Sequence, residues 1–296
     1  MAEVLDRDAG RYRVTHTEGM IRLAWLKVKQ SLAVSSRHGA ADSLGTAGEV
    51  PYVVLHTHNQ LPALGKHNVQ SLFNSIAPRY DLLNHLLSCG VYVYWRKRAI
   101  EHLRDVHPRR ILDVATGTGD LAIAALRLSP ESVVGVDIAG EMLMRGQAKV
   151  KRRRLDHRIT LRSGAAENLE FPAASFDAAM VAFGARNFDH LAGGLREMHR
   201  VVRPGGKIVV LEFSRPRHVL FRQMYFFYFQ NILPFLGRII SRNKEAYRYL
   251  PDTVMKFPEG KEFQEILEGV GFSDTRVERL TFGIVSIYEG IKGEQQ

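Results

Sequence analysis

The sequence predicts an α/β fold with a mostly parallel, seven-stranded sheet that is completed by an antiparallel hairpin. Strand-like and helix-like segments alternate between about residues 110 and 213. A glycine-rich turn follows the first of these strands, and two short strand-like segments come last. Strands that alternate with helices at this spacing are joined by right-handed crossovers, so they pair in parallel.

The elements of the alternating region can be placed in order. Strands are expected over 110–115, 133–137, 158–163, 176–182 and 207–213. Helices are expected over 69–77, 82–88, 95–103, 120–128, 140–153 and 189–202. A turn is predicted at R-P-G-G, Arg203–Gly206, because proline cannot extend the preceding helix and two glycines let the chain reverse.

The last segment, V-E-R-L-T-F-G-I-V-S-I-Y-E-G, predicts two antiparallel strands separated near Gly283. A parallel sheet finished by such a hairpin is typical of class I methyltransferases, which have a Rossmann-like sheet. It is not the arrangement expected of a dehydrogenase.

The glycine-rich turn lies in I-L-D-V-A-T-G-T-G-D, which ends at Asp120. Gly117 and Gly119 lack a Cβ, so the chain can turn sharply and a ligand can approach the backbone. Asp113 ends the first strand, and Asp137 ends the next, twenty positions after Gly117 (137 − 117 = 20). An acid at that distance usually holds ribose hydroxyls, so these residues predict a site for a nucleotide-like cofactor.

Two cofactor classes fit this turn. Gly117, Gly119 and Ala122 satisfy the G-x-G-x-x-A spacing of a dinucleotide site, so NAD(P) remains an alternative. Asp120, however, would place a carboxylate at the helix start, where it would repel a pyrophosphate. S-adenosylmethionine has no phosphate and carries a sulfonium and an ammonium, so the acids favour this cofactor.

Composition restricts the class of protein only broadly. The 296 residues can bury one core and leave an appendage, and the net charge of +10 permits nucleic acid, anionic membrane or acidic ligands as partners. The basic run Lys149–Arg158 is interpreted as a solvated helix end or a lipid-binding patch. The single cysteine, Cys89, excludes an intrachain disulfide framework and argues against methyltransferases that attack pyrimidine carbons through a cysteine.

Residues 1–66 differ from the rest and are expected to form a partly disordered extension before a methyltransferase domain at 67–293. A short amphipathic helix at 21–32 and a small-residue linker are predicted there. His56 and His58 have no further ligand near them, so no metal site is expected. Neither a secretory signal nor a mitochondrial presequence is expected at the N-terminus. No apolar run reaches the roughly eighteen residues of a transmembrane helix.

Three segments resemble the ubiquinone/menaquinone biosynthesis C-methyltransferase family. Tyr80–Trp95, Y-D-L-L-N-H-L-L-S-C-G-V-Y-V-Y-W, is similar to its amino-terminal signature, with Leu83 where Met is usual and Tyr92 where His is usual. Arg200–Ser214, R-V-V-R-P-G-G-K-I-V-V-L-E-F-S, resembles a second signature. The third segment is A-F-G-A-R-N at Ala182–Asn187, with a similar A-Y-R-Y-L-P-D-T further on.

This resemblance implies S-adenosylmethionine-dependent methylation of a ring carbon of a polyprenylated quinol. The bacterial demethylmenaquinone enzymes are most similar, which implies demethylmenaquinol as acceptor; the alternative is the 2-polyprenyl-6-methoxybenzoquinol intermediate of ubiquinone biosynthesis. The family's cofactor contacts fall on Thr118, Asp137, Ala165 and Ala166. The acid or amide that the family often has at Ala165 is missing.

Arg186 and Asn187 follow the fourth predicted strand, at the edge where open α/β sheets bind ligands. We expect Arg186 to stabilise a phenolate on the acceptor, directly or through a water, and Asn187 to orient the ring. The alternative for Arg186 is a structural salt bridge.

The aromatic segment Val219–Ile240 predicts a lid or a channel for the polyprenyl tail. With Arg222, Arg238 and Arg242 it would also make peripheral contact with the inner face of the membrane, so the protein is expected in the cytoplasm or on that face. A homodimer is left open. The rival functions are an RNA methyltransferase and a cofactor-binding scaffold, but no N-P-P-Y motif and no base-stacking platform supports nucleic acid as a partner.

Overall fold

The computed structural model describes residues 66–88, 90–217, 222–223, 225 and 253–294. They all belong to one compact unit, Gln60–Gln296. The expectations for residues 1–65, for Cys89 and for most of the aromatic segment at 219–240 lie outside the described residues. None of the helices within the described ranges is long and apolar enough to cross a membrane.

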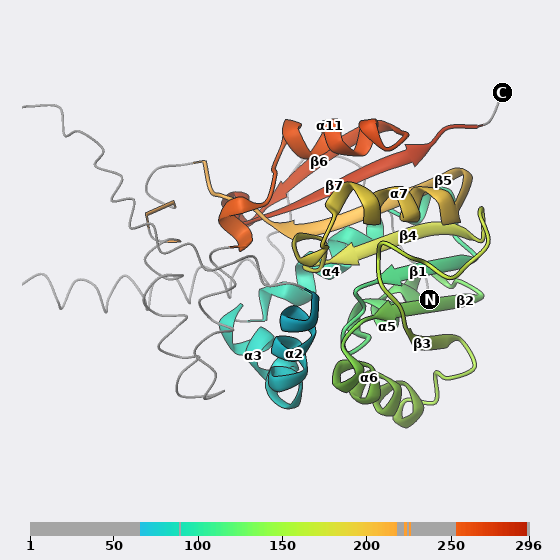
Figure 1. The fold of residues 1–296 in the computed structure, drawn as a ribbon, viewed down its shortest axis with the longest axis vertical. Helices are drawn as coiled ribbons and strands as arrows, with labels where there is room; N and C mark the ends of the chain where they lie inside the picture. Colours follow the sequence, from blue (N-terminus) through green and yellow to red (C-terminus); the bar gives the residue numbers. More distant parts are fainter. Residues whose placement is uncertain (1–65, 89, 218–221, 224, 226–252, 295–296) are drawn as a thin grey trace, which may run out of the picture. The chain divides into compact units, whose positions relative to one another are not determined.

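The sheet has seven strands in the order β3-β2-β1-β4-β5-β7-β6 (Figure 1). Their bounds are β1 Arg110–Val114, β2 Ser132–Asp137, β3 Ile159–Ser163, β4 Phe176–Ala182, β5 Val202–Phe213, β6 Phe272–Leu280 and β7 Val285–Lys292. β1 to β5 pair in parallel, whereas β7 pairs antiparallel with both β5 and β6. The predicted mostly parallel sheet with a terminal antiparallel hairpin is therefore confirmed.

β1 lies in the middle of the parallel part and is apolar because both of its faces are covered. Leu112 pairs with Val134 of β2 on one side and with Ala179 of β4 on the other. Successive side chains of β1 enter different cores, with Ile111 in one and Leu112 in the other.

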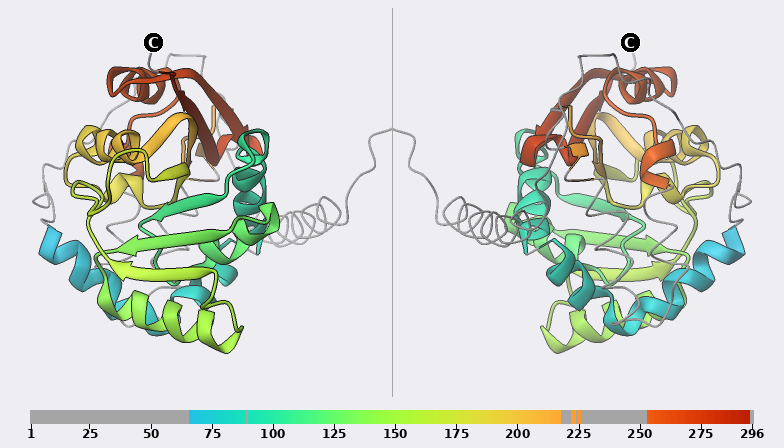
Figure 2. Two further views of the ribbon diagram at one scale, coloured as in Figure 1. Left: turned by 90° about the vertical axis from the view of Figure 1, so that its right-hand side faces the viewer. Right: turned by 90° about the vertical axis from the view of Figure 1, so that its left-hand side faces the viewer.

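Helices cover both faces of the sheet, as the two views of Figure 2 show. The core that contains Ile111 also takes side chains from α4 (Val91–Glu101), α5 (Asp120–Ala125) and α6 (Gly140–Arg152). The core that contains Leu112 takes side chains from α7 (Leu191–Val201) and α11 (Lys261–Gly269). Each core is built from apolar positions that alternate along the strands.

The helices before α4 lie beside the carboxyl ends of the parallel strands (Figure 1). They are α2 (Lys66–Ile76), the 3-10 turn η1 (Ala77–Arg79) and α3 (Tyr80–Leu87). Phe73 and Tyr80 pack edge to face, with ring centroids 6.3 Å apart, and form a small core with Met142 of α6. These helices are thereby held over the end of the sheet where a ligand would bind.

Several bounds differ from the sequence-based expectation, and two of the differences have a clear local cause. The helix predicted over 120–128 ends as an α-helix at Ala125 and continues as the 3-10 turn η3, Leu126–Leu128. The predicted R-P-G-G turn is part of β5, as an irregularity in its pairing. Val202 pairs with Phe176 and Lys207 with Ala178, so four residues of β5 lie opposite one residue of β4. The left-handed φ of +71° at Gly205 lets the strand make this bulge without ending.

Candidate cofactor site

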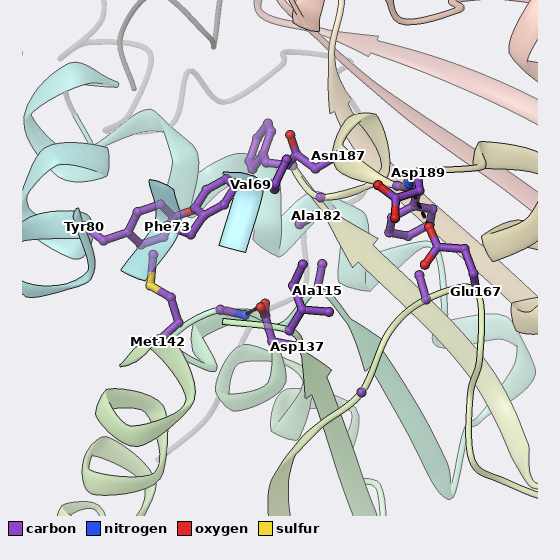
Figure 3. A pocket seen from close by; sticks show the side chains of 17 residues that line it. Val69, Phe73, Tyr80, Ala115, Asp137, Met142, Glu167, Ala182, Asn187 and Asp189 are labelled. Carbon is purple, nitrogen blue, oxygen red and sulfur yellow. Dashed lines mark hydrogen bonds between the residues drawn. The ribbon is translucent and has the colours of Figure 1, made fainter. Parts of the chain in front are cut away.

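A pocket lies at the carboxyl ends of β1, β2 and β4, with a volume of about 700 Å³ when the part open to solvent is included. Figure 3 shows Phe73, Tyr80 and Met142 on one side, and Glu167 and Asp189 on the opposite side. The lining residues are Val69, Phe73, Tyr80, Ala115, Gly117, Asp137, Ile138, Met142, Gly164, Ala166, Glu167, Ala182, Phe183, Gly184, Asn187, Phe188 and Asp189.

Asp137, the predicted ribose-binding acid, lines the pocket at the end of β2. Its Oδ2 accepts a hydrogen bond from the backbone N–H of Gly117 at 2.7 Å, and its Oδ1 accepts one from Ala139 at 2.8 Å. Burial raises the pKa of this carboxyl group, and the backbone N–H groups oppose the rise. Each oxygen has a second lone pair, so the carboxylate can still accept hydroxyl groups from a ribose.

The two predicted glycines of the turn have different roles. Gly117 lines the pocket with φ +55°, and a Cβ there would meet no atom within 4 Å, so its open side is available to a ligand. Gly119 has φ +76° and does not line the pocket. A Cβ on Gly119 would lie 3.0 Å from Leu161, so this glycine serves close packing of the turn on β3.

Asp113 lies beneath the turn, where it is 1% exposed and does not line the pocket. The hydroxyl of Thr116 donates to its Oδ2 at 2.6 Å. Burial raises the pKa of Asp113 to about 7, against the opposing hydrogen bond from Thr116. The carboxyl group therefore supports the turn from below. It is not exposed to the pocket, although a direct contact with the cofactor was expected.

Thr118 and Asp120 also point away from the pocket lining. The hydroxyl of Thr118 donates to Asp81 of α3 at 2.7 Å. Asp120 pairs with Arg96 of α4 at 2.9 Å and with Lys149 of α6 at 2.6 Å. Burial alone would raise the pKa of Asp120, but these cations outweigh it and the pKa is lowered. The repulsion of a pyrophosphate by Asp120 is thus a weaker argument than the sequence suggested, because its charge is already compensated.

The connection after β3 contributes the predicted Ala166 to the lining, whereas Ala165 lies outside it and forms an isolated bridge with Asn168. Glu167, which the sequence analysis did not single out, lines the pocket, and its Oε1 accepts the backbone N–H of Asp189 at 2.8 Å. An acid therefore reaches the pocket two positions after the place where the family often has one.

The charge of the pocket separates the two cofactor classes. Its lining contains the three acids Asp137, Glu167 and Asp189 and, within the described part of the chain, neither lysine nor arginine. A pyrophosphate would lack a cation here, whereas the sulfonium and ammonium of S-adenosylmethionine would be attracted. The residues present therefore fit S-adenosylmethionine and do not fit NAD(P).

The two residues expected to act on the acceptor lie in the 3-10 turn η4, Ala185–Asn187. Asn187 lines the pocket, but Arg186 does not. Arg186 Nη1 donates to Glu212 Oε2 at 2.9 Å, to Glu212 Oε1 at 3.0 Å and to the carbonyl of Phe183 at 2.6 Å. The side chains are 7% and 0% exposed, so this is a buried ion pair, as the structural alternative for Arg186 supposed.

The aromatic side of the pocket was not identified from the sequence as part of a site. Val69 and Phe73 come from α2, Tyr80 begins α3 and Met142 lies in the first turn of α6. The signature around Tyr80 was the one available signal, because helix periodicity alone does not say that a helix covers a pocket.

The fold and the acidic pocket define a class I methyltransferase. The chain belongs to the ubiE/COQ5 methyltransferase family, whose model matches residues 62–292.

Two relatives illustrate this membership. The ubiquinone/menaquinone biosynthesis C-methyltransferase UbiE of Geotalea daltonii is 45% identical over 226 residues, which are 76% of this chain and 96% of that protein. The demethylmenaquinone methyltransferase of Bacteroides fragilis is 43% identical over 225 residues, which are 76% of this chain and 92% of that protein.

Solved structures agree on the fold alone. A putative S-adenosyl-L-methionine-dependent methyltransferase from Methanococcus maripaludis has a TM-score of 0.53 at 16% identity and covers 76% of this chain and 95% of its own. The cyclase SpnF has a TM-score of 0.56 at 16% identity, with coverage of 77% and 96%.

Proposed function

We propose that the protein transfers the methyl group of S-adenosylmethionine to a ring carbon of demethylmenaquinol, which gives menaquinol in menaquinone biosynthesis. The observation that carries this proposal is the family match over residues 62–292, with a 43%-identical relative named demethylmenaquinone methyltransferase. The acidic, lysine- and arginine-free lining of the described pocket supports the same cofactor on independent grounds.

The second candidate acceptor is the benzoquinol intermediate of ubiquinone biosynthesis. It is favoured by the 45%-identical relative whose name covers both ubiquinone and menaquinone biosynthesis. Both acceptors present the same chemistry at the reacting carbon, so one pocket can serve both.

On the cofactor side, we assign Asp137 to the ribose hydroxyls and Gly117 to close backbone contact, with Ala166 packing against the adenosyl group. S-adenosylmethionine supplies a methyl group that its sulfonium already activates, so the residues mainly have to position the reactants and exclude water. The open side of Gly117 and the half-buried carboxylate of Asp137, which lines the pocket, support this assignment.

On the acceptor side, Asn187 is positioned to orient the ring because it lines the pocket. Carbon methylation needs electron density on the ring carbon, which a neighbouring hydroxyl provides once it loses its proton. Arg186 would stabilise the resulting phenolate across a bridging water, since its own side chain is buried beside Glu212.

Turnover with labelled S-adenosylmethionine tests the proposal against both quinols in parallel. The full chain should methylate demethylmenaquinol, and transfer to neither quinol, with cofactor bound, would contradict the proposed reaction. Arg186→Lys should lower turnover roughly 100-fold while cofactor affinity is kept. Arg203→Ala is the control, because Arg203 also pairs with an acid, Asp177, but lies outside the pocket lining.

We also propose peripheral attachment to anionic membrane, because the acceptor's polyprenyl tail resides in lipid and the net charge is +10. The segment at 219–240 expected to make this contact lies largely outside the described residues. Flotation with vesicles with and without anionic lipid tests it, and absence from both floating fractions would contradict it.

A further inference from the structure

Behind the glycine-rich turn, five polar side chains form one group, here called the Lys149 cluster. Its members come from α3, α4, α5, α6 and the segment that joins β1 to α5. They are Asp81, Arg96, Thr118, Asp120 and Lys149. None of the five lines the pocket.

Lys149 is the centre of this cluster. Its Nζ donates to Asp81 Oδ2 at 2.6 Å, to Asp120 Oδ1 at 2.6 Å and to the hydroxyl of Thr118 at 3.1 Å. Thr118 in turn donates to Asp81 Oδ1 at 2.7 Å. The Lys149 side chain is 11% exposed and Asp120 is 21% exposed, whereas Asp81 is 43% exposed, so solvent screens the contact to Asp81 more than the contact to Asp120.

Three members of the cluster are next to, or on the same helix as, a residue that lines the pocket. Asp81 directly follows Tyr80, which lies on the aromatic side, and Thr118 directly follows Gly117 of the turn. Lys149 lies on α6, the helix that also presents Met142. The cluster therefore joins the helical cover of the pocket to its floor from outside the pocket.

We propose that Asp81 and Lys149 are positioning residues that hold Tyr80 over bound S-adenosylmethionine and fix the turn at Gly117. Asp81 spans the junction, because one of its oxygens binds Lys149 of α6 and the other binds Thr118 of the turn. Without it, α3 loses its polar contacts to the turn and to α6 and keeps, among the described residues, only the apolar packing of Tyr80 with Met142, so the helices that cover the pocket separate from the turn more easily. The cofactor then dissociates faster, although no group that touches it has changed.

The test is cofactor binding by the full chain with Asp81→Ala, measured as the dissociation constant by calorimetry and as the dissociation rate by stopped-flow displacement. Both should rise about tenfold, as expected for loss of a charged hydrogen bond. Lys149→Met should act in the same direction, and Lys149→Arg should restore most of the affinity because it keeps the cation. The proposal depends on the proposed function only for the identity of the ligand, S-adenosylmethionine. Binding needs no acceptor, so failure to methylate either quinol leaves this test intact.

Asp105→Ala is the matched control, because it also removes an acid from a buried lysine. Asp105 lies 2.7 Å from Lys207 Nζ, and Lys207 is 5% exposed. Neither residue lines the pocket. The control should lower the melting temperature about as much as Asp81→Ala but leave cofactor binding at the wild-type value.

Unchanged cofactor binding in Asp81→Ala, or an equal loss in Asp105→Ala, would overturn the proposal and leave a purely structural cluster. If Asp81→Ala does not fold, Asp81→Asn keeps the side-chain shape while removing the charge. A wild-type dissociation rate in that variant would overturn the proposal equally.

Discussion

Arg186 and Glu212 form a buried ion pair that joins η4 to β5, with Nη1 and Oε2 2.9 Å apart. Glu212 is fully buried, and this burial raises its pKa while the Arg186 guanidinium opposes the rise. The pair holds the turn that places Asn187 in the pocket, so its contribution to stability and its contribution to catalysis have to be measured separately.

Removal of one partner should be strongly destabilising, because the other charge would remain buried alone. Glu212→Ala should lower the free energy of unfolding by about 3–5 kcal/mol, measured by denaturant titration. Glu131→Ala breaks the exposed pair with Arg109 and should change the free energy of unfolding far less, because solvent screens both charges. Similar losses in the two variants would show that the Arg186–Glu212 pair is solvated in solution.

Asp137 should determine cofactor affinity. Asp137→Ala should raise the dissociation constant of S-adenosylmethionine roughly 100-fold, because two charge-assisted hydrogen bonds to ribose are lost. The control is Asp177→Ala, since Asp177 also accepts two backbone N–H groups, from Arg109 and Arg110, but lies outside the pocket lining. Both variants should have a lower melting temperature, but only Asp137→Ala should bind the cofactor weakly. Equal cofactor affinities in the two variants would show that Asp137 does not bind the cofactor.

The buried carboxyl group of Asp113 should make stability depend on pH. Its pKa is raised from 3.8 to about 7, so the folded protein keeps a proton there that the unfolded chain has already lost above about pH 4. Stability should therefore fall as the pH rises from about 4 to about 7 and then level off.

Melting temperatures of the wild type and Asp113→Asn across this range check the expected slope. Asp137 and Glu212 are shifted in the same direction by burial, so the substitution should reduce the slope without abolishing it. An identical slope in the two proteins would mean that Asp113 is ionised in the folded state.

Gly146 allows α6 to lie directly against the turn. A Cβ there would come within 2.7 Å of Leu161 Cδ1 and within 3.1 Å of the backbone carbon of Thr118. Gly146→Ala should therefore lower the free energy of unfolding by about 1–3 kcal/mol and weaken cofactor binding. Gly140→Ala on the same helix meets open space and should stay within about 0.5 kcal/mol of the wild type. Equal unfolding curves for Gly146→Ala and Gly140→Ala would show that α6 can shift away from the turn without loss of stability.

The central strands β1, β2 and β4 were predictable because each is a mainly apolar run between clear turn signals. β4 has the expected bounds, Phe176–Ala182, and β2 differs by a single residue. The positions of Gly117 and Asp137 were predictable for a related reason, since the ends of neighbouring parallel strands meet at one edge of the sheet.

The directions of several side chains were not predictable, because their partners come from distant parts of the chain. Asp120 is compensated by Arg96 and Lys149, which lie on two other helices. Thr118 binds Asp81, 37 positions away, instead of lining the pocket. Spacing within a motif fixes how far apart residues are along the chain, but it does not tell what packs on their other side.

The antiparallel insertion of β7 between β5 and β6 has a consequence for synthesis on the ribosome. β5 is complete at Phe213, but its neighbour β7 begins only at Val285. One edge of β5 therefore stays unpaired until a strand that starts 72 positions later has been synthesised (285 − 213 = 72). During that interval a long apolar edge is exposed, and such edges pair readily with other chains. A nascent chain halted before β7 would therefore depend on chaperones to prevent aggregation.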